Sequence, residues 1–144
     1  VTSLVGAILW IALEQEITSK AGATVDVQKN EQEELQTRLQ AWIDFVVPKI
    51  KAQESGGDPN AVNWEDSKVT GYPSRGCFQY QPNTWSSAIT KYNLLPNTEE
   101  AEYFNFIGDC EFQEIVTRAV LENELNAWLH WKTTFLVLNL PKRP

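Results

Sequence analysis

The sequence is poor in the residues that build metal sites and nucleic-acid interfaces. It contains one His and two Cys, and the cysteines do not form a Cys-x-x-Cys pattern, so we predict no metal site and no cofactor. Its 12 basic residues are outnumbered by 19 acidic ones, which gives a net charge of -7. Because no basic patch interleaves with the aromatic residues, a nucleic-acid partner is not expected.

Long hydrophobic runs are also absent. The most apolar stretch, "LVGAILWIAL" at residues 4–13, has ten residues, which is too short to span a bilayer. It is either the remnant of a membrane anchor, through which the chain would attach to a membrane, or an ordinary buried helix. The small and polar stretch "KAGATVDVQKN" at residues 20–30 predicts a linker. We therefore expect an N-terminal segment over 1–30 and a folded domain over 31–144.

What the sequence does have is apolar and aromatic surface. Hydrophobic residues make up 42% and aromatic residues 11%, with six Trp among them, enough for one domain with a real core. Aromatic rings also line carbohydrate clefts, because ring faces pack on the apolar faces of sugars. Core packing is the commoner role for any single Trp.

Residues 30–55 carry a helical pattern. Apolar residues recur at spacings of four, three, four and four, which places them on one helix face; they are Leu35, Leu39, Trp42, Val46 and Ile50. Asn30 and Glu33 are spaced as a capping box. Pro48 predicts either a kink or the start of a second helix. Gly56 or Gly57 suits the left-handed position that ends a helix.

The rest of the chain predicts a short strand followed by helices. "GCFQY" at residues 76–80 has the alternation of a strand. Four helical stretches follow it: "PNTWSSAITKYNL", "TEEAEYFNFIG", "DCEFQEIVTRAVLENE" with Asp109 as its cap, and "NAWLHWKTTFLVLNL". We predict a mainly α fold with a small β element between the helix that ends near Glu54 and the later helices, and a helical N-terminal extension. Cys77 and Cys110 form either one disulfide or two buried thiols.

Glu54 is the candidate for acid–base chemistry. A carboxylate in the last turn of a helix faces the negative end of the helix dipole, which disfavours its ionised form. An apolar wall would raise its pKa further. A carboxyl that holds its proton near neutral pH is what protonation of a glycosidic oxygen requires, although most glutamates near helix ends are simply solvated.

The surroundings of Glu54 resemble the lysozyme-like superfamily. Glu54-Ser55 is followed by the turn "DPNAVN" at 58–63, by "GCFQ" at 76–79 and by "PNT" at 82–84. This order is most similar to soluble lytic transglycosylases and resuscitation-promoting-factor-like wall hydrolases. The resemblance implies an enzyme of the cell envelope, outside the cytoplasm, whose partner is the glycan strands of bacterial peptidoglycan.

The resemblance assigns roles to particular positions. Glu54 matches the catalytic acid, Ser55 the serine beside it and Gln79 the glutamine that lines the cleft. Asn63 and Gln79 would orient the sugar by hydrogen bonds, and Ser55 is a further substrate-binding candidate. Candidates for stacking on sugars are Tyr80, Trp85, Trp128 and Trp131, each with core packing as its alternative. His130 is interpreted as a structural residue.

Three readings of function follow, of which the third is a helical protein that binds a partner and whose match at "ESGG" is accidental. In the first, the chain is a lytic transglycosylase or muramidase in which Glu54 gives a proton to the leaving oxygen and then takes one back. Glu65 and Asp66 are candidates for a second carboxylate, with a solvated acidic loop as the alternative. In the second reading, the chain is a non-catalytic module that binds or organises wall glycan. The acidic charge, "GCF" where many relatives carry Leu-Met, and the lack of a late Ala-Tyr-Asn signature favour this second reading.

Overall fold

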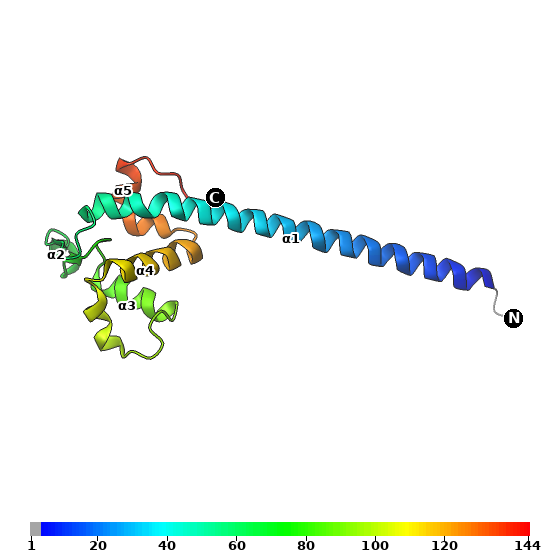
Figure 1. Ribbon diagram of the computed structural model, residues 1–144, viewed down its shortest axis with the longest axis horizontal. Helices are drawn as coiled ribbons and strands as arrows, with labels where there is room; N and C mark the ends of the chain where they lie inside the picture. Colours follow the sequence, from blue (N-terminus) through cyan, green and yellow to red (C-terminus); the bar gives the residue numbers. More distant parts are fainter. Residues whose placement is uncertain (1–3) are drawn as a thin grey trace. The chain divides into compact units, whose positions relative to one another are not determined.

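The computed structural model describes the backbone of residues 4–144 and the side chains of residues 27–144. In chain order the elements are α1 (Leu4–Ser55), β1 (Val62–Asn63), α2 (Ser67–Thr70), β2 (Ser74–Arg75), α3 (Pro82–Lys91), the 3-10 helix η1 (Glu100–Phe106), α4 (Cys110–Asn123), the 3-10 helix η2 (Ala127–Trp131) and α5 (Lys132–Val137) (Figure 1). The predicted mainly helical fold with one small sheet is confirmed. The chain divides into two compact units, Val1–Arg38 and Leu39–Pro144.

One face of α1 supplies the core of the second unit. Leu39, Trp42, Val46 and Ile50 are buried as the spacing predicts, while Leu35 is 53% exposed and precedes this unit in the sequence. Ile43 and Val47 widen the stripe, since a helix against a globular core buries more than a narrow seam. The other core residues come mainly from α3, α4 and the segment after it. Two ion pairs tie α4 to α1, Arg118 to Asp44 at 2.6 Å and Lys51 to Glu114 at 4.0 Å.

The predicted linker at 20–30 and the predicted helix starts at Asn30 and Pro48 are wrong. Residues 20–30 are helical, so they are not an irregular linker, and Asn30 caps no helix start. Helix propagation is cooperative, so a weak stretch between good helix formers stays helical. Lys29 and Glu33 add an ion pair at 3.9 Å within the first unit. The helix also continues through Pro48, which is exposed, so water can satisfy the carbonyl that loses its partner.

The proposed anchor lies beyond the side chains that the structure describes. The backbone of residues 4–13 belongs to α1, but the choice between anchor remnant and buried helix stays open there. Among the described residues, no helix is both long and apolar enough to cross a bilayer.

The small sheet lies between α1 and α3 in the chain, as expected, but in a different segment. β1 and β2 pair antiparallel, with Val62 opposite Arg75 and Asn63 opposite Ser74. The predicted strand at 76–80 is instead a turn, closed by a hydrogen bond from the Gln79 amide to the Gly76 carbonyl at 3.2 Å. Positive φ angles of 75° at Gly76 and 54° at Gln79 exclude a regular strand there.

This turn, residues 76–79, is fastened to α4. Cys77 and Cys110 form a disulfide with their Cα atoms 5.5 Å apart, which decides between the two alternatives for these cysteines. The buried Gln113 side chain accepts a hydrogen bond from the Phe78 amide at 2.7 Å and donates one to the Arg75 carbonyl at 3.2 Å. Asp109 caps α4 as predicted, because its side chain accepts from the Glu111 and Phe112 amides at 3.0 Å each.

The remaining helices agree in position with the sequence pattern and differ in type. α3 begins with Pro82 at its first position, where a missing N–H costs nothing. The stretch from Glu100 to Phe106 is a 3-10 helix, and the C-terminal stretch divides into η2 and α5. Trp85 is fully buried and donates to the Tyr103 carbonyl at 2.8 Å, so it belongs to the core and not to a sugar-stacking surface.

Candidate functional site

Glu54 lies in the last turn of α1, where the chain leaves the helix. Gly56 and Gly57 both have the predicted left-handed conformation, with φ of 68° and 83°, and the Gly56 amide still bonds to the Ala52 carbonyl at 3.0 Å. Glu54 is half-buried. Its Oε1 accepts a hydrogen bond from the hydroxyl of Thr134 on α5, so the carboxyl has a fixed orientation.

An open cavity of about 580 Å³ borders Glu54. Three parts of the chain form it: the end of α1, the segment from Asn63 to Gln81, and the segment from Leu129 to Thr134 in η2 and α5. The lining residues are Gln53, Glu54, Asn63, Asp66, Val69, Thr70, Ser74, Gln79, Gln81, Leu129, His130, Trp131, Lys132, Thr133 and Thr134. Most are polar, and a cavity of this size and character suits a hydrophilic ligand with many hydrogen-bonding groups.

The cavity raises the proton affinity of Glu54. Burial is the main cause of the raised pKa of Glu54, the hydrogen bond from Thr134 opposes it, and the negative charge of Asp66 adds to it. The position of Glu54 at the C-terminal end of a helix acts in the same direction. A carboxyl of this kind keeps its proton at a higher pH than an exposed glutamate and can donate it to a bound ligand.

The structure brings Asn63 and Gln79 to the same cavity as Glu54. The Gln79 side-chain amide donates to the Gly76 and Ala61 carbonyls at 2.8 and 3.3 Å. Its carbonyl oxygen has no partner among the described residues. Asn63 accepts from the Glu65 amide at 3.1 Å, which leaves its side-chain NH₂ for a ligand. Each residue is held on one side and offers one hydrogen-bonding group on the other.

Ser55 and Tyr80 are not part of this cavity. The Ser55 hydroxyl donates to the Cys77 carbonyl at 2.9 Å and accepts from the Gly57 amide at 3.0 Å, so it ties the helix end to the turn. Tyr80 is only 3% exposed, and its hydroxyl bonds to Thr117 at 3.0 Å. Their predicted contacts with sugar are therefore replaced by packing and hydrogen bonds inside the protein.

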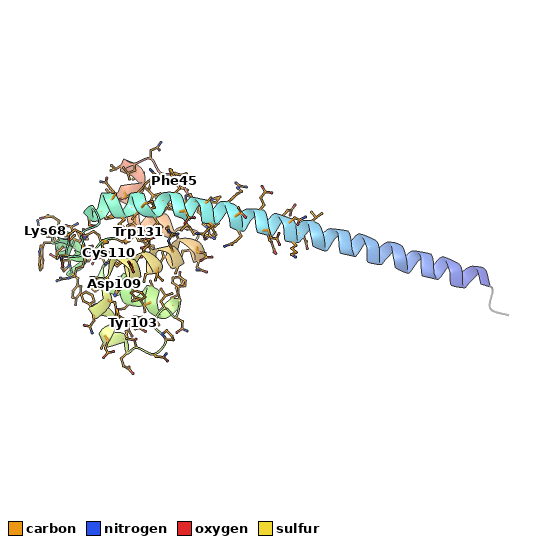
Figure 2. The ribbon with its side chains drawn as sticks, in the orientation of Figure 1. Phe45, Lys68, Tyr103, Asp109, Cys110 and Trp131 are labelled. Atoms are coloured by element: carbon orange, nitrogen blue, oxygen red, sulfur yellow. A yellow bond between two sulfur atoms is a disulfide. The ribbon has the colours of Figure 1, made fainter. Side chains whose placement is uncertain are left out.

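The Trp131 ring belongs to both the cavity wall and the core. It lines the cavity but is only 5% exposed, and its indole N–H donates to the Phe78 carbonyl at 3.0 Å. Figure 2 labels its position in the folded chain. Trp131 therefore supports the turn at 76–79 from behind and presents little ring face to a ligand. Trp128 packs near Phe135, with ring centroids 6.5 Å apart, which is a packing role too.

Of the two candidates for a second carboxylate, only Asp66 lines the cavity. It accepts a hydrogen bond from the buried hydroxyl of Ser74. Glu65 is outside the cavity wall and pairs with Lys68 at the surface. Thr134 was not predicted from the sequence, because it lies 80 residues from Glu54 and no local motif marks such a contact.

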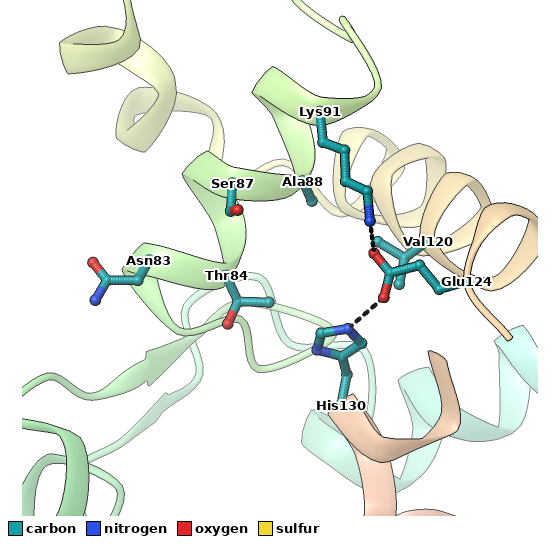
Figure 3. Close-up of a pocket in the computed structure, with 8 residues that line it drawn as sticks. All are labelled: Asn83, Thr84, Ser87, Ala88, Lys91, Val120, Glu124 and His130. Carbon is teal, nitrogen blue, oxygen red and sulfur yellow. Dashed lines mark hydrogen bonds and ion pairs between the residues drawn. The ribbon is translucent and has the colours of Figure 1, made fainter. Parts of the chain in front are cut away.

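Figure 3 shows the residues that line a second cavity of about 280 Å³. His130 lines both cavities. Glu124 holds the second one together, accepting from Tyr92 at 2.6 Å, from Lys91 at 2.9 Å and bonding to His130 at 3.0 Å. Burial alone would raise the pKa of Glu124, but these partners lower it to about 2. Thus His130 has the structural role expected of it and also connects the two cavities.

Comparison with known proteins adds no relative from which a role could be transferred. No family model matches the chain, and no curated protein or solved structure is significantly similar to it. Among the residues that the structure describes, no three His, Cys, Asp or Glu side chains gather to hold a metal ion. The function is therefore argued from the cavity and its proton donor.

Proposed function

We propose that this chain is a lytic transglycosylase, which cleaves the β-1,4 bond between N-acetylmuramic acid and N-acetylglucosamine in peptidoglycan. The observation that carries the proposal is the half-buried Glu54, with its raised pKa, on the wall of an open and polar cavity. The lysozyme-like interpretation of the fold is part of the same proposal. It draws on the motif order around Glu54 and on the helix–hairpin–helix arrangement that carries the site.

Glu54 serves first as acid and then as base. It donates its proton to the glycosidic oxygen, the bond from C1 of the muramic acid to that oxygen breaks, and the glucosamine side leaves as an alcohol. The N-acetyl group of the substrate stabilises the positive charge on C1. Ionised Glu54 then takes the proton of the sugar's own 6-hydroxyl, whose oxygen closes a 1,6-anhydro ring. No water is consumed, and Glu54 ends protonated again.

Thr134 and the amides of the cavity wall support these two steps. The Thr134 hydroxyl points at Oε1 of Glu54 and stabilises the carboxylate that forms when the proton leaves. The free carbonyl of Gln79 and the free NH₂ of Asn63 can bind sugar hydroxyls and the N-acetyl group. Because their other groups are tied to the backbone, they bind with little loss of rotamer freedom.

The second cavity extends the site for a polymer. It runs along α3 past Asn83, Thr84 and Ser87, whose hydroxyl and amide groups suit a chain of sugars. His130 on the shared wall joins this surface to the cavity of Glu54. A glycan strand lying across both cavities would place one of its bonds at Glu54 and its neighbouring sugars along α3.

The proposed place of action is the cell envelope, outside the cytoplasm. Peptidoglycan lies there, and the disulfide between Cys77 and Cys110 fits an oxidising compartment. Attachment to the membrane through residues 4–13 is part of this proposal.

A non-catalytic module that binds glycan is the second candidate. The bond between Glu54 and Thr134 favours it, because it ties α1 to α5 and gives Glu54 a purely structural use. In that case the cavity would hold sugars without cleaving them.

Mass spectrometry of muropeptides after incubation with peptidoglycan separates the two candidates. We expect the wild-type chain to release anhydro-ended fragments, and Glu54→Gln to release none while still binding the polymer. Glu65→Gln, which neutralises an exposed carboxylate outside the cavity, is the matched control and should cleave normally. A wild-type chain that sediments with peptidoglycan but releases nothing would be the binding module, and a Glu54→Gln variant with full activity would refute the role of Glu54.

A further inference from the structure

The C-terminal segment after α5 is fastened to α1 and leaves an apolar groove beside it. The Trp42 indole N–H donates to the Pro141 carbonyl at 2.7 Å, and the Leu140 amide donates to the Phe135 carbonyl at 2.9 Å. These hydrogen bonds fix the backbone of the segment, so the groove between it and α1, of about 390 Å³, has a defined shape. The lining residues are Phe45 (labelled in Figure 2), Lys49, Ala52 and Gln53 of α1, and Leu138, Asn139 and Leu140 of the segment.

The outer face of α5 continues this apolar surface. Leu136 and Val137 are 67% and 64% exposed, whereas Thr134 and Phe135 are buried. The period of a helix therefore places the two pairs on opposite faces. Lys132 lies one turn before Leu136 and shares its face. Large apolar side chains that gather at the surface mark a site that a partner covers.

Basic residues accompany this apolar surface, in a chain whose net charge is -7. Residues 125–144 contain three basic residues and no acidic one. The Lys49 amine lies 4.7 Å from the centroid of the Phe45 ring, and the Lys142 amine lies 4.4 Å from that of Trp128. Neither amine pairs with a carboxylate among the described residues. Their charges are therefore available to an anionic partner.

We propose that this surface docks on an anionic lipid membrane. The C-terminal surface, as we call it, consists of the apolar Phe45, Leu136, Val137 and Leu138 and the basic Lys49 and Lys142. Its apolar side chains enter the boundary between headgroups and acyl chains, and its amines pair with lipid phosphates. Lysines suit this place because their stems pack on apolar surface while their charges stay among the headgroups.

An anionic membrane fits the C-terminal surface better than a second copy of the chain does. Two copies joined through the same surface would cover the apolar side chains, but they would also bring the same lysines into one interface. Like charges in an interface disfavour association. A lipid surface supplies acyl chains and negative charge together.

The inference goes beyond glycan cleavage, and it concerns a different part of the chain from residues 4–13. α5 connects the two sites, because residues 132–134 line the cavity of Glu54 and Leu136 and Val137 follow on the next turn. Docking of α5 would therefore hold that cavity close to the lipid.

Sedimentation of the full chain with lipid vesicles measures the apolar part of the contact. We expect binding to vesicles of phosphatidylcholine mixed with phosphatidylglycerol. Leu136→Ser combined with Val137→Ser should weaken this binding by about tenfold or more, because two apolar side chains no longer leave water. Both side chains are exposed, so the fold should persist, which a thermal melt checks. Ile115→Ser is the matched control, since Ile115 on α4 is 52% exposed, and it should bind as the wild type does.

The same assay measures the contribution of charge. Binding should be weak on vesicles of phosphatidylcholine alone and should fall as salt is added. Lys49→Gln combined with Lys142→Gln should weaken binding about fivefold for each charge removed. Lys29→Gln combined with Lys68→Gln is the matched control, because these two lysines pair with carboxylates, and it should have little effect.

Hydrogen–deuterium exchange of the full chain locates the contact without any substitution. With anionic vesicles present, the amides of residues 136–143 should exchange more slowly than in the free chain. Protection confined to residues 4–13 would overturn the proposal, because the vesicle would then be bound through the N-terminal segment alone.

Other results would also overturn membrane docking. One is vesicle binding that neither C-terminal double variant weakens. Another is a dimer in lipid-free solution that Leu136→Ser with Val137→Ser dissociates, since the C-terminal surface would then bind a second copy. Glu54→Gln should bind vesicles as the wild type does, so a failure of glycan cleavage and a failure of docking are distinguishable.

Discussion

Replacing both Cys77 and Cys110 by alanine should destabilise the folded chain by about 3–4 kcal/mol. The disulfide closes a loop with a sequence separation of 33 residues, and the chain-entropy model for a loop of this length gives that magnitude. The closed loop runs from Cys77 to Cys110 and contains most of the turn at 76–79, α3 and η1. The removed cross-link therefore mainly enlarges the unfolded ensemble, and the site loses the covalent tie between its turn and α4.

Urea unfolding followed by Trp fluorescence measures this effect. The midpoint should fall, with ΔG in water obtained by linear extrapolation. Cys77 is fully buried, so alanine also removes packing volume there. Wild-type protein in reductant keeps both sulfur atoms and separates the two contributions, because its loss of stability comes from the cross-link alone. We expect reduced wild type to account for most of the loss.

A loss below about 1 kcal/mol in reduced wild type would refute this reasoning. It would mean that Gln113 and the core hold the turn at 76–79 equally well in the unlinked chain, or that the unfolded chain is already constrained there. Mass measurement of the chain isolated from its native host gives an independent check, since two free thiols would show that no cross-link forms there.

Three further predictions concern charge and backbone conformation. Burial raises the pKa of Glu54 above its ordinary value of 4.5, so the stability that this group contributes is full below pH 4.5 and is lost as the pH rises through the folded pKa. In thermal melts, Glu54→Gln should therefore match wild type in acid and exceed it at neutral pH by about a few tenths of a kcal/mol. Equal stability of the two proteins at both pH values would contradict this. Although burial opposes them, hydrogen bonds lower the pKa of Glu124 from 4.5 to about 2, so its contribution to the stability of the fold is present above pH 4.5 and is lost towards pH 2. Glu124→Gln should lower the free energy of unfolding by about 1–2 kcal/mol at pH 7 and by progressively less in acid. A loss of stability that does not change with pH would point to packing instead. Gly76→Ala should lower the free energy of unfolding by about 2–3 kcal/mol or prevent folding, because φ at Gly76 is 75° and a Cβ there would collide with the Gln113 amide. Gly71 has a φ of 84° but open space around it, so Gly71→Ala should lower it by only about 1 kcal/mol. Equal losses at the two positions would disprove the collision.

The sequence predicted those parts of the fold that depend on neighbours in the chain. Spacing alone predicts four buried residues of α1, namely Leu39, Trp42, Val46 and Ile50. The cap of α4 by Asp109 depends on one side chain and two nearby amides. The left-handed Gly56 and Gly57 are fixed by backbone sterics, which act within single residues. Each of these predictions needed only a local rule.

Most of the predictions that failed concern segments whose structure is decided by contacts with residues far away in the sequence. The alternation of "GCFQY" favours a strand, but the disulfide and Gln113 pull this segment against α4 as a turn. Tyr80 has the chemistry of a sugar-binding residue, but its ring is buried in the core and its hydroxyl is bonded to Thr117. The linker at 20–30 failed for the opposite reason, because helix cooperativity extended a local pattern further than its composition suggested.

The candidate site combines both kinds of determinant. The position of Glu54 depends on local features, the end of α1 and the two glycines that follow it. Asn63 and Gln79 lie on the segment that comes next in the chain. What gives the carboxyl its proton affinity is non-local: burial under the C-terminal segment, the hydroxyl of Thr134 and the charge of Asp66. A sequence motif can therefore nominate the acid, but whether that acid holds its proton depends on groups that only the folded chain brings to it.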